Sequence, residues 1–161
     1  AQIRDIAAGS GLPLGGCRIE DTADPVACAQ RAAALVREGQ AEALMKGSLH
    51  TDELMGVIVS RAAGLRTARR ISHVFVMDVP AHDRLLLVTD AAVNIAPELR
   101  VKADIVRNAI DLARAIGIET PRVALLSAVE TVNPGIPSTV DAAALREMGQ
   151  RGEITGGVLD G

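Results

Sequence analysis

The stretch Leu44-Met45-Lys46-Gly47-Ser48-Leu49-His50-Thr51 has the pattern of a strand that ends in a polar loop before a helix. The apolar run over 43–45 predicts a short buried strand, and a cation, a glycine, two hydroxyls and an imidazole follow it. In open α/β sheets, ligands bind just beyond the carboxyl ends of the strands. A helix start adds N–H donors and the positive end of a dipole. The stretch therefore predicts a loop that binds phosphate or another oxyanion, the alternative being an ordinary turn with a solvated lysine.

The same alternation of strand, polar loop and helix continues along the chain. Helical patterns cover 2–8, 25–38, 51–63, 98–116 and 138–148. The expected N-caps are Asp24, Thr51, and either Ser138 or Thr139. Extended apolar patterns cover 17–19, 43–45, 71–77, 84–88, 122–126 and 154–159. This order predicts an α/β fold of mostly parallel sheets flanked by helices.

One hairpin interrupts the alternation. The β-rich segments 71–77 and 84–88 are joined by Pro80-Ala81-His82-Asp83, which predicts an antiparallel pair. A change of pairing at this point predicts a domain boundary, with residues 1–70 in a first α/β domain and 71–161 in a second. The basic run Arg66, Arg69 and Arg70 would form the crossing, either as a solvated loop or as a receiver of a phosphorylated ligand.

Composition excludes several classes of protein. The chain has 161 residues, a net charge of −3 and a single aromatic residue, Phe75. Proteins that bind single-stranded nucleic acid stack bases on aromatic side chains and carry basic surfaces, so a nucleic-acid partner is not expected. Cys17 and Cys28 lack a second pair for a zinc site, and they are expected as reduced thiols, with one disulfide as the alternative.

Cellular location and chain length give further expectations. No apolar stretch approaches the length that spans a bilayer, and the first residues have a helical pattern without a leader, so a cytoplasmic protein without membrane contact is expected. The chain begins inside a helical pattern and stops at the polar end of a strand, at Asp160-Gly161. We expect it to be an internal portion of a longer protein.

Three polar strand ends contain the candidate site residues. They lie at 46–51, 90–94 and 127–133, and parallel strands would bring them to one edge or one cleft; polarity where strands meet water is the alternative. Asp90 and Asn94 would cap the following helix or position a ligand. His50 would orient an oxyanion, act as acid or base, or be structural. Ser127 lacks a Gly-x-Ser-x-Gly elbow, and no Walker loop, dinucleotide fingerprint or metal-ligand spacing occurs.

Four motifs together closely resemble the phosphate acetyltransferase and phosphate butyryltransferase family, and especially its butyryl-type branch. They are Leu44-Met45-Lys46-Gly47 with Thr51, then Thr89-Asp90-Ala91-Ala92-Val93-Asn94-Ile95-Ala96-Pro97, then the run from Val123 to Pro134, and finally Leu159-Asp160-Gly161. They occur in the family's order and cover almost the whole chain.

The resemblance implies reversible acyl transfer between coenzyme A and inorganic phosphate. It implies two α/β domains around a cleft, in the isocitrate/isopropylmalate dehydrogenase-like architecture, and a homodimer or larger oligomer. Coenzyme A would be a substrate, with no further cofactor and no metal. The implied substrate-binding residues are Lys46, Gly47, Ser48, His50, Thr51, Asp90, Asn94 and Ser127.

The chain departs from the family pattern in two ways. Acetyl-specific members have a phosphate-binding arginine shortly after the position of Thr51, where this chain has Leu54-Met55-Gly56; Lys46 would supply the missing charge. The family's serine, arginine and aspartate residues for catalysis lie in a segment that follows Gly161, so the catalytic residues stay unknown and residues 1–161 alone are expected to be inactive. The alternatives are a non-catalytic fragment that binds coenzyme A or phosphate, and a decarboxylating dehydrogenase-like enzyme.

Overall fold

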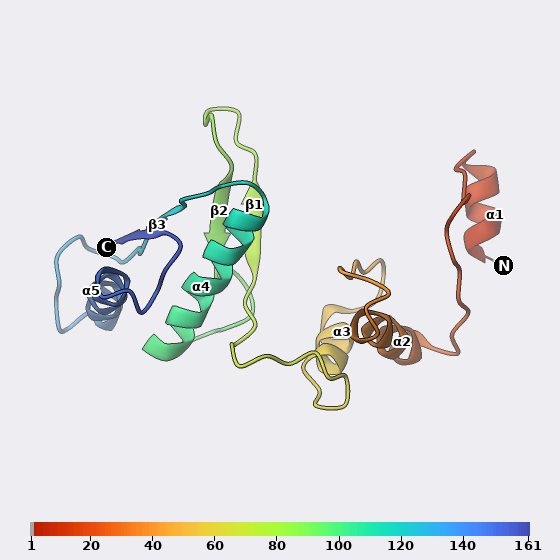
Figure 1. Cartoon of the computed structure of the whole chain (residues 1–161), viewed down its shortest axis with the longest axis horizontal. Coiled ribbons are helices and arrows are strands. Elements are labelled where there is room, and N and C mark those ends of the chain that lie inside the picture. The colour runs from red at the N-terminus through yellow and green to blue at the C-terminus, as the bar shows by residue number, and fades with distance from the viewer. Residues whose placement is uncertain (1) are drawn as a thin grey trace. The chain divides into compact units, whose positions relative to one another are not determined.

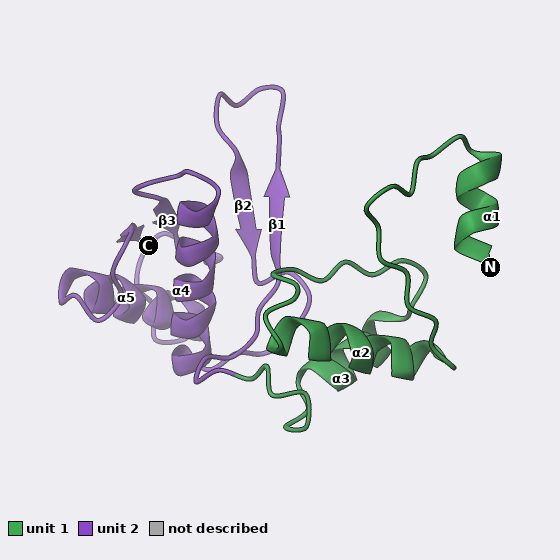
Figure 2. Cartoon of the chain, turned by 45° about the vertical axis from the view of Figure 1, so that its right-hand side comes forward, with its two compact units in different colours: residues 1–66 green, residues 67–161 purple. Residues whose placement is uncertain are grey.

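A computed structural model describes residues 2–161, and the chain divides into two compact units, residues 1–66 and 67–161 (Figure 2). The first unit contains the helices α1 (Gln2–Gly9), α2 (Pro25–Arg37) and α3 (Thr51–Ile58) (Figure 1). The second contains β1 (Val74–Met77), β2 (Leu86–Thr89), α4 (Leu99–Ala115), β3 (Arg122–Ala124), α5 (Pro137–Gln150) and β4 (Val158–Asp160). The protein is therefore a mixed α/β chain with small sheets. No helix among the described residues is long and apolar enough to cross a membrane.

Helix α2 forms where its capping signals predict. The Asp24 carboxylate accepts a hydrogen bond from Ala27 N at 2.8 Å, and Pro25 fills the first helical position. Gly39, two residues beyond the helix, adopts a φ of 71°, which a glycine reaches at little cost. Ala29 and Ala33 are each 1% exposed, so small side chains form the buried face of this helix. Helix α3 is its main packing partner in the unit.

Four predictions for the first unit are wrong. Residues 43–45 and 17–19 form no strands, and the Met45 side chain is 98% exposed instead of buried. A strand persists only with a pairing partner, and a three-residue apolar run does not supply one. Thr51, predicted as an N-cap, is the first residue of α3, and His50 is its N-cap. Helix α3 also ends at Ile58, well before residue 63, where its predicted pattern ends.

The core of the second unit lies between its two long helices and the β3–β4 sheet. β3 and β4 pair in parallel, with Val123 opposite Leu159. Hydrogen bonds from Val158 N to Pro121 O and from Leu125 N to Asp160 O extend the pairing beyond both ends of β3. The buried core residues are Ala103, Val106, Ile110, Leu145, Ile154 and Leu159. The strands predicted over 122–126 and 154–159 are therefore present in shorter form.

The predicted hairpin is confirmed, but the mostly parallel sheet is not. β1 and β2 pair antiparallel, with Phe75 opposite Val88 and Met77 opposite Leu86, in a two-stranded sheet separate from β3–β4. Figures 1 and 2 both show α4 beside this hairpin, in agreement with its contacts to β2. The side chains of Phe75, Val88, Met77 and Leu86 are all at least two-fifths exposed, so this face of the hairpin is half-covered.

The helices of the second unit differ from their predictions only at the ends. Helix α4 matches the pattern over 98–116, with Glu98 as its N-cap. Helix α5 has Ile136 as its N-cap, so neither Ser138 nor Thr139 caps it. Thr139 is instead 4% exposed, and its hydroxyl bonds the carbonyls of Asn133 and Ile136 within the preceding turn. A buried hydroxyl needs such partners, and the loop provides them.

Candidate functional site

The loop that precedes α3 presents a cation and several backbone donors to solvent. Lys46 is exposed, and its Nζ donates to Leu49 O at 3.1 Å, which closes the loop on itself. Among the described residues, no acceptor serves the N–H groups of Gly47, Ser48 and Leu49. Unpaired amides beside an ammonium group are the donors that oxyanions bind. This loop can therefore hold a phosphate group chemically.

The start of α3 both helps and opposes such an anion. Thr51 begins the helix, so its first-turn N–H groups lie next to the loop. The first turn also carries Asp52 and Glu53, and the Glu53 carboxylate accepts from His50 N at 3.3 Å. These two carboxylates already interact favourably with the helix dipole, and they repel a second anion. Lys46 is the cation of this loop that offsets their negative charge.

In the second unit, Asp90 shapes the loop that follows β2. Its carboxylate accepts from His73 N at 3.0 Å, from Asn94 N at 2.9 Å and from the Asn94 side-chain amide. Partial burial alone would raise the pKa of Asp90, but the hydrogen bonds from the Asn94 side chain and from backbone N–H groups outweigh it and lower the pKa. The interpretation of Asp90 and Asn94 as caps of the following helix is wrong, since Glu98 occupies that position.

Sequence reasoning missed the polar residues of α4 that anchor the chain before β1. Asp104 Oδ2 accepts from Arg70 N at 3.0 Å, and Asn108 Nδ2 donates to Arg70 O and to Ser72 Oγ, both at 2.9 Å. From the other side, Asn94 Nδ2 donates to Ile71 O at 3.0 Å. Side chains therefore replace a neighbouring strand as hydrogen-bonding partners of this segment. The only signal in the sequence is the i,i+4 spacing of 104 and 108, which also fits a solvated helix face.

His73 lies at the end of this segment. Its ring packs edge-on against Phe75, with ring centroids 4.5 Å apart. Nδ1 is buried and has no hydrogen-bonding partner among the described residues. The backbone carbonyl of His73 accepts a hydrogen bond from Thr89 Oγ1 at 2.7 Å. This bond joins the two strands of the hairpin just before the loop of Asp90.

Ser127 lies beyond the end of β3, in a second polar loop of the same unit. Its Oγ is 2.7 Å from Ser138 Oγ, in the first turn of α5. Asn133 Oδ1 accepts from Gly135 N at 2.9 Å, and Asn133 N donates to Thr139 Oγ1 at 2.9 Å. The loop after β3 is thus fixed to the start of α5. A hydroxyl that already bonds another hydroxyl can still accept or donate a further bond to a ligand.

The five candidate residues of the first unit lie in the loop before α3 and at its first residue, Thr51. Asp90 and Asn94 are bonded to each other in the second unit. Ser127 belongs to a different loop of that second unit. The convergence of the three loops on one ligand stays a prediction. Within residues 2–161 there is no group of three or more His, Cys, Asp or Glu side chains placed to hold a metal ion.

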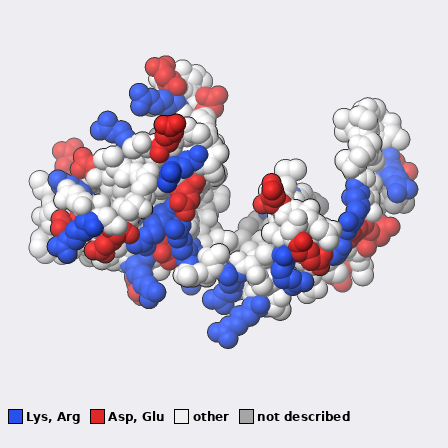
Figure 3. All heavy atoms as spheres, viewed as in Figure 1, with Lys and Arg blue, Asp and Glu red and all other residues white. Residues whose placement is uncertain are grey.

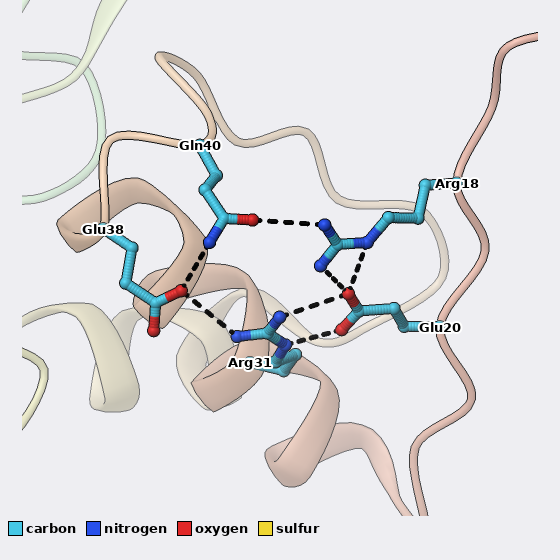
Figure 4. Close-up of polar contacts among 5 residues, drawn as sticks. All are labelled: Arg18, Glu20, Arg31, Glu38 and Gln40. Carbon is cyan, nitrogen blue, oxygen red and sulfur yellow. Dashed lines mark hydrogen bonds and ion pairs between the residues drawn. The ribbon is translucent and has the colours of Figure 1, made fainter.

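The most extensive ionic network lies elsewhere in the first unit, where it has a structural role (Figure 4). Hydrogen bonds from Arg31 and then Arg18 lower the pKa of Glu20 to about 2. Arg31 also pairs with Glu38 at 3.5 Å, and Gln40 bonds Glu38 and Arg18. Through this network, the segment with Arg18 and Glu20, which precedes α2, is bonded to Arg31 in that helix and to Glu38 and Gln40 beyond its end. Figure 3 shows acidic and basic side chains interspersed on the visible face of the chain, without a large region of one sign.

Comparisons with known proteins give a consistent picture. The profile of the phosphate acetyl/butaryl transferase family matches residues 16–161. Phosphate acetyltransferase of Rhizobium meliloti is 62% identical over 161 residues, which are 100% of this chain and 51% of that protein. Phosphate butyryltransferase of Clostridium acetobutylicum is 42% identical over 160 residues, 99% of this chain and 53% of that protein.

A solved structure agrees with these sequence relatives. The branched-chain phosphotransacylase from Enterococcus faecalis V583 aligns with a TM-score of 0.75 at 35% identity, over 87% of this chain and 50% of that one. The chain therefore spans about half the length of the relatives that it matches.

Proposed function

Because the chain belongs to the phosphate acetyl/butaryl transferase family, we propose that its protein is a phosphotransacylase. The reaction is acyl-CoA + phosphate = acyl phosphate + CoA. The observation that carries this proposal is the 62% identity of the whole chain to a phosphate acetyltransferase, which leaves no part of residues 1–161 outside the match. Relatives with acetyl and butyryl names both occur, so the proposal does not extend to the length of the acyl chain.

In this proposal the loop before α3 binds the phosphate group of the acyl phosphate or of inorganic phosphate. Lys46 supplies the positive charge, and the N–H groups of Gly47 and Ser48 supply directed donors. His50 and Thr51 flank these donors on the helix side. Since phosphate and acyl phosphate share the charged PO₃ portion, one pocket serves both directions of the reaction.

The chemical step needs a thiolate and a polarised carbonyl. The coenzyme A thiolate attacks the carbonyl carbon of the acyl phosphate, a C–S bond forms, and the bond from carbon to the bridging oxygen breaks to release phosphate. Donors that stabilise the oxyanion formed on the way lower the barrier, and holding both substrates in line supplies the orientation. We assign no described residue as the base that deprotonates the thiol.

For the second unit we propose substrate contacts at Asp90, Asn94 and Ser127. Asp90 acts by shaping its loop, because its carboxylate already accepts several N–H donors. The Ser127 hydroxyl retains hydrogen-bonding capacity for a ligand, whereas Asn94 Nδ2 already donates to Ile71 O and to Asp90, which leaves Asn94 Oδ1 as an acceptor for a ligand donor. We also propose that the whole protein has the two-domain isocitrate/isopropylmalate dehydrogenase-like architecture, forms a homodimer or larger oligomer in the cytoplasm, and needs no cofactor besides its coenzyme A substrate.

The test is acyl phosphate formation by the purified complete gene product, with phosphate and a series of acyl-CoA thioesters. Lys46→Met keeps the length of the side chain and removes its charge, and we expect it to raise KM for phosphate about tenfold or more, since a charge-assisted hydrogen bond contributes about 1.5–3 kcal/mol. Lys46→Arg is the charge-retaining control and should lose less. Tight coenzyme A binding without turnover would replace this proposal by a non-catalytic binding role. Turnover that needs a divalent metal and a nicotinamide would favour a dehydrogenase.

A further inference from the structure

We infer that Arg70 binds a phosphoryl group of a substrate beside the loop of Asp90 and Asn94. This inference rests on the proposed function and adds a residue to its binding site. The backbone of Arg70 is held on both sides, since its N–H donates to Asp104 at 3.0 Å and its carbonyl accepts from Asn108 at 2.9 Å. An exposed arginine whose main chain is fixed in this way loses less freedom on binding than one in a solvated loop.

The guanidinium of Arg70 is directed at the candidate site. Its Nε lies 3.4 Å from Asn94 Oδ1, at the outer limit of a hydrogen bond. Within residues 2–161, no carboxylate lies within ion-pair distance of Arg70, and its two terminal nitrogens donate no hydrogen bond. Two parallel N–H donors on a planar cation match two oxygens of a phosphate group.

The neighbouring arginine provides the contrast. Arg69 forms an ion pair with Asp111 of α4, so its charge is already compensated inside the unit. Two adjacent arginines of one basic run therefore have different surroundings. The sequence alone offered both as possible receivers of a phosphorylated ligand, and the structure selects Arg70.

The two carboxylates that bond Arg70 N and its neighbour Asn94 already accept several hydrogen bonds. The Asp104 carboxylate accepts from Arg70 N, and it also pairs with Arg107 at 3.4 Å. The Asp90 carboxylate accepts from His73 N and from the backbone and side chain of Asn94. Neither carboxylate competes directly with a phosphate for the terminal guanidinium nitrogens.

The phosphoryl group has two possible sources in this reaction. Inorganic phosphate and acyl phosphate carry one, and coenzyme A carries a 3′-phosphate and a pyrophosphate. The test therefore compares Arg70→Gln with Arg69→Gln in the complete gene product, using three ligands: inorganic phosphate, coenzyme A and dephospho-coenzyme A. Binding is followed by calorimetry and by the NMR signals of arginine Nε–H groups, and KM and kcat are measured separately.

We expect Arg70→Gln to weaken binding of one phosphorylated ligand by about tenfold or more, with a rise in the matching KM and a smaller change in kcat. Loss confined to inorganic phosphate identifies the transferred group, and loss for coenzyme A but not dephospho-coenzyme A identifies the 3′-phosphate. Equal affinities in wild type and Arg70→Gln, or an equal loss in Arg69→Gln, would overturn the inference. A wild-type protein that binds these ligands through Arg70 yet transfers no acyl group would refute the proposed function while sustaining the role of Arg70.

Discussion

Replacing Gly157 by alanine should loosen the β3–β4 pairing that supports the core of the second unit. An ideal Cβ at this position lies 2.9 Å from Pro121 O and 3.2 and 3.3 Å from the Cγ1 and Cδ1 atoms of Ile110. Ile110 is 1% exposed and cannot move freely. Pro121 O accepts the hydrogen bond from Val158 N at 2.9 Å that begins the pairing. The new methyl group must therefore shift the buried Ile110 side chain and also disturb that hydrogen bond.

The cost follows from these two routes. Pushing a core side chain off its rotamer costs about 0.5–1.5 kcal/mol, and weakening a buried backbone hydrogen bond costs about 1 kcal/mol. Restricting the unfolded chain returns about 0.4–1 kcal/mol, because the φ of Gly157 is not positive and suits alanine. With both costs present, the expected net loss in the free energy of unfolding is about 0.5–2 kcal/mol, at the lower end of the usual range for overpacking.

Gly149→Ala is the matched control. Its ideal Cβ would meet Leu159 at 3.4 Å, an ordinary contact, and the residue lies in the last turn of α5. Alanine favours the helix there, so we expect unchanged or slightly higher stability, by about 0.5 kcal/mol. Urea denaturation of the complete gene product, with hydrogen exchange of the Val158 and Leu125 amides, measures both variants. Undiminished protection in Gly157→Ala, or an equal loss in Gly149→Ala, would refute the packing argument.

Three further predictions concern ionic contacts. Lys102→Met removes the 2.6 Å ion pair to Asp141 that joins α4 to α5, in which the two side chains are 28% and 25% exposed. We expect the free energy of unfolding to fall by about 1 kcal/mol. A double-mutant cycle with Asp141→Asn that shows no coupling would contradict this. The pKa of Asp90 is lowered in the folded state, so the ionised carboxylate contributes its full stability above its ordinary pKa of 3.8. This contribution is lost as the pH falls through the lower pKa of the folded state. Hydrogen-exchange protection of the amides in the Asp90 loop should therefore fall below about pH 4 in wild type but not in Asp90→Asn. The Glu20 carboxyl should titrate near a pKa of about 2 by NMR, and Arg31→Gln should move it toward 4.5; an unchanged titration would remove Arg31 as the main cause.

Local signals predicted much of the fold. The pair Asp24-Pro25 with Gly39 beyond the helix end bounded α2, and apolar periodicity located α4 to within a residue or two. The turn at 80–83 predicted the hairpin. These features depend on residues close in sequence, so the pattern contains the information that the fold uses.

Features that depend on distant partners were not predictable. The apolar residues 43–45 read as a strand, but no described strand pairs with them. The β1 strand begins only at Val74, since side chains of α4 and of the loop after β2 bond residues 70–73 in place of a ladder. Likewise, Asp104 and Asn108 bond the backbone of Arg70 only because the segment before β1 runs alongside α4. A helix with polar residues at this spacing has the same pattern when its face is merely solvated.

In the second unit, Asp90 and Arg70 have different roles in the candidate site. Asp90 lies in one of the motifs that carry the family resemblance, and its oxygens accept converging N–H groups, which lower its pKa. A carboxylate held in this state is a poor proton donor and a weak base, so its contribution is to fix the positions of Asn94 and His73. Arg70 has the complementary arrangement: its main chain is bonded on both sides, and its guanidinium makes only the long 3.4 Å contact from Nε to Asn94 Oδ1 among the described residues. The acid therefore builds the loop and the cation faces the ligand, which is why substitutions at Asp90 should disturb loop order while substitutions at Arg70 should disturb affinity.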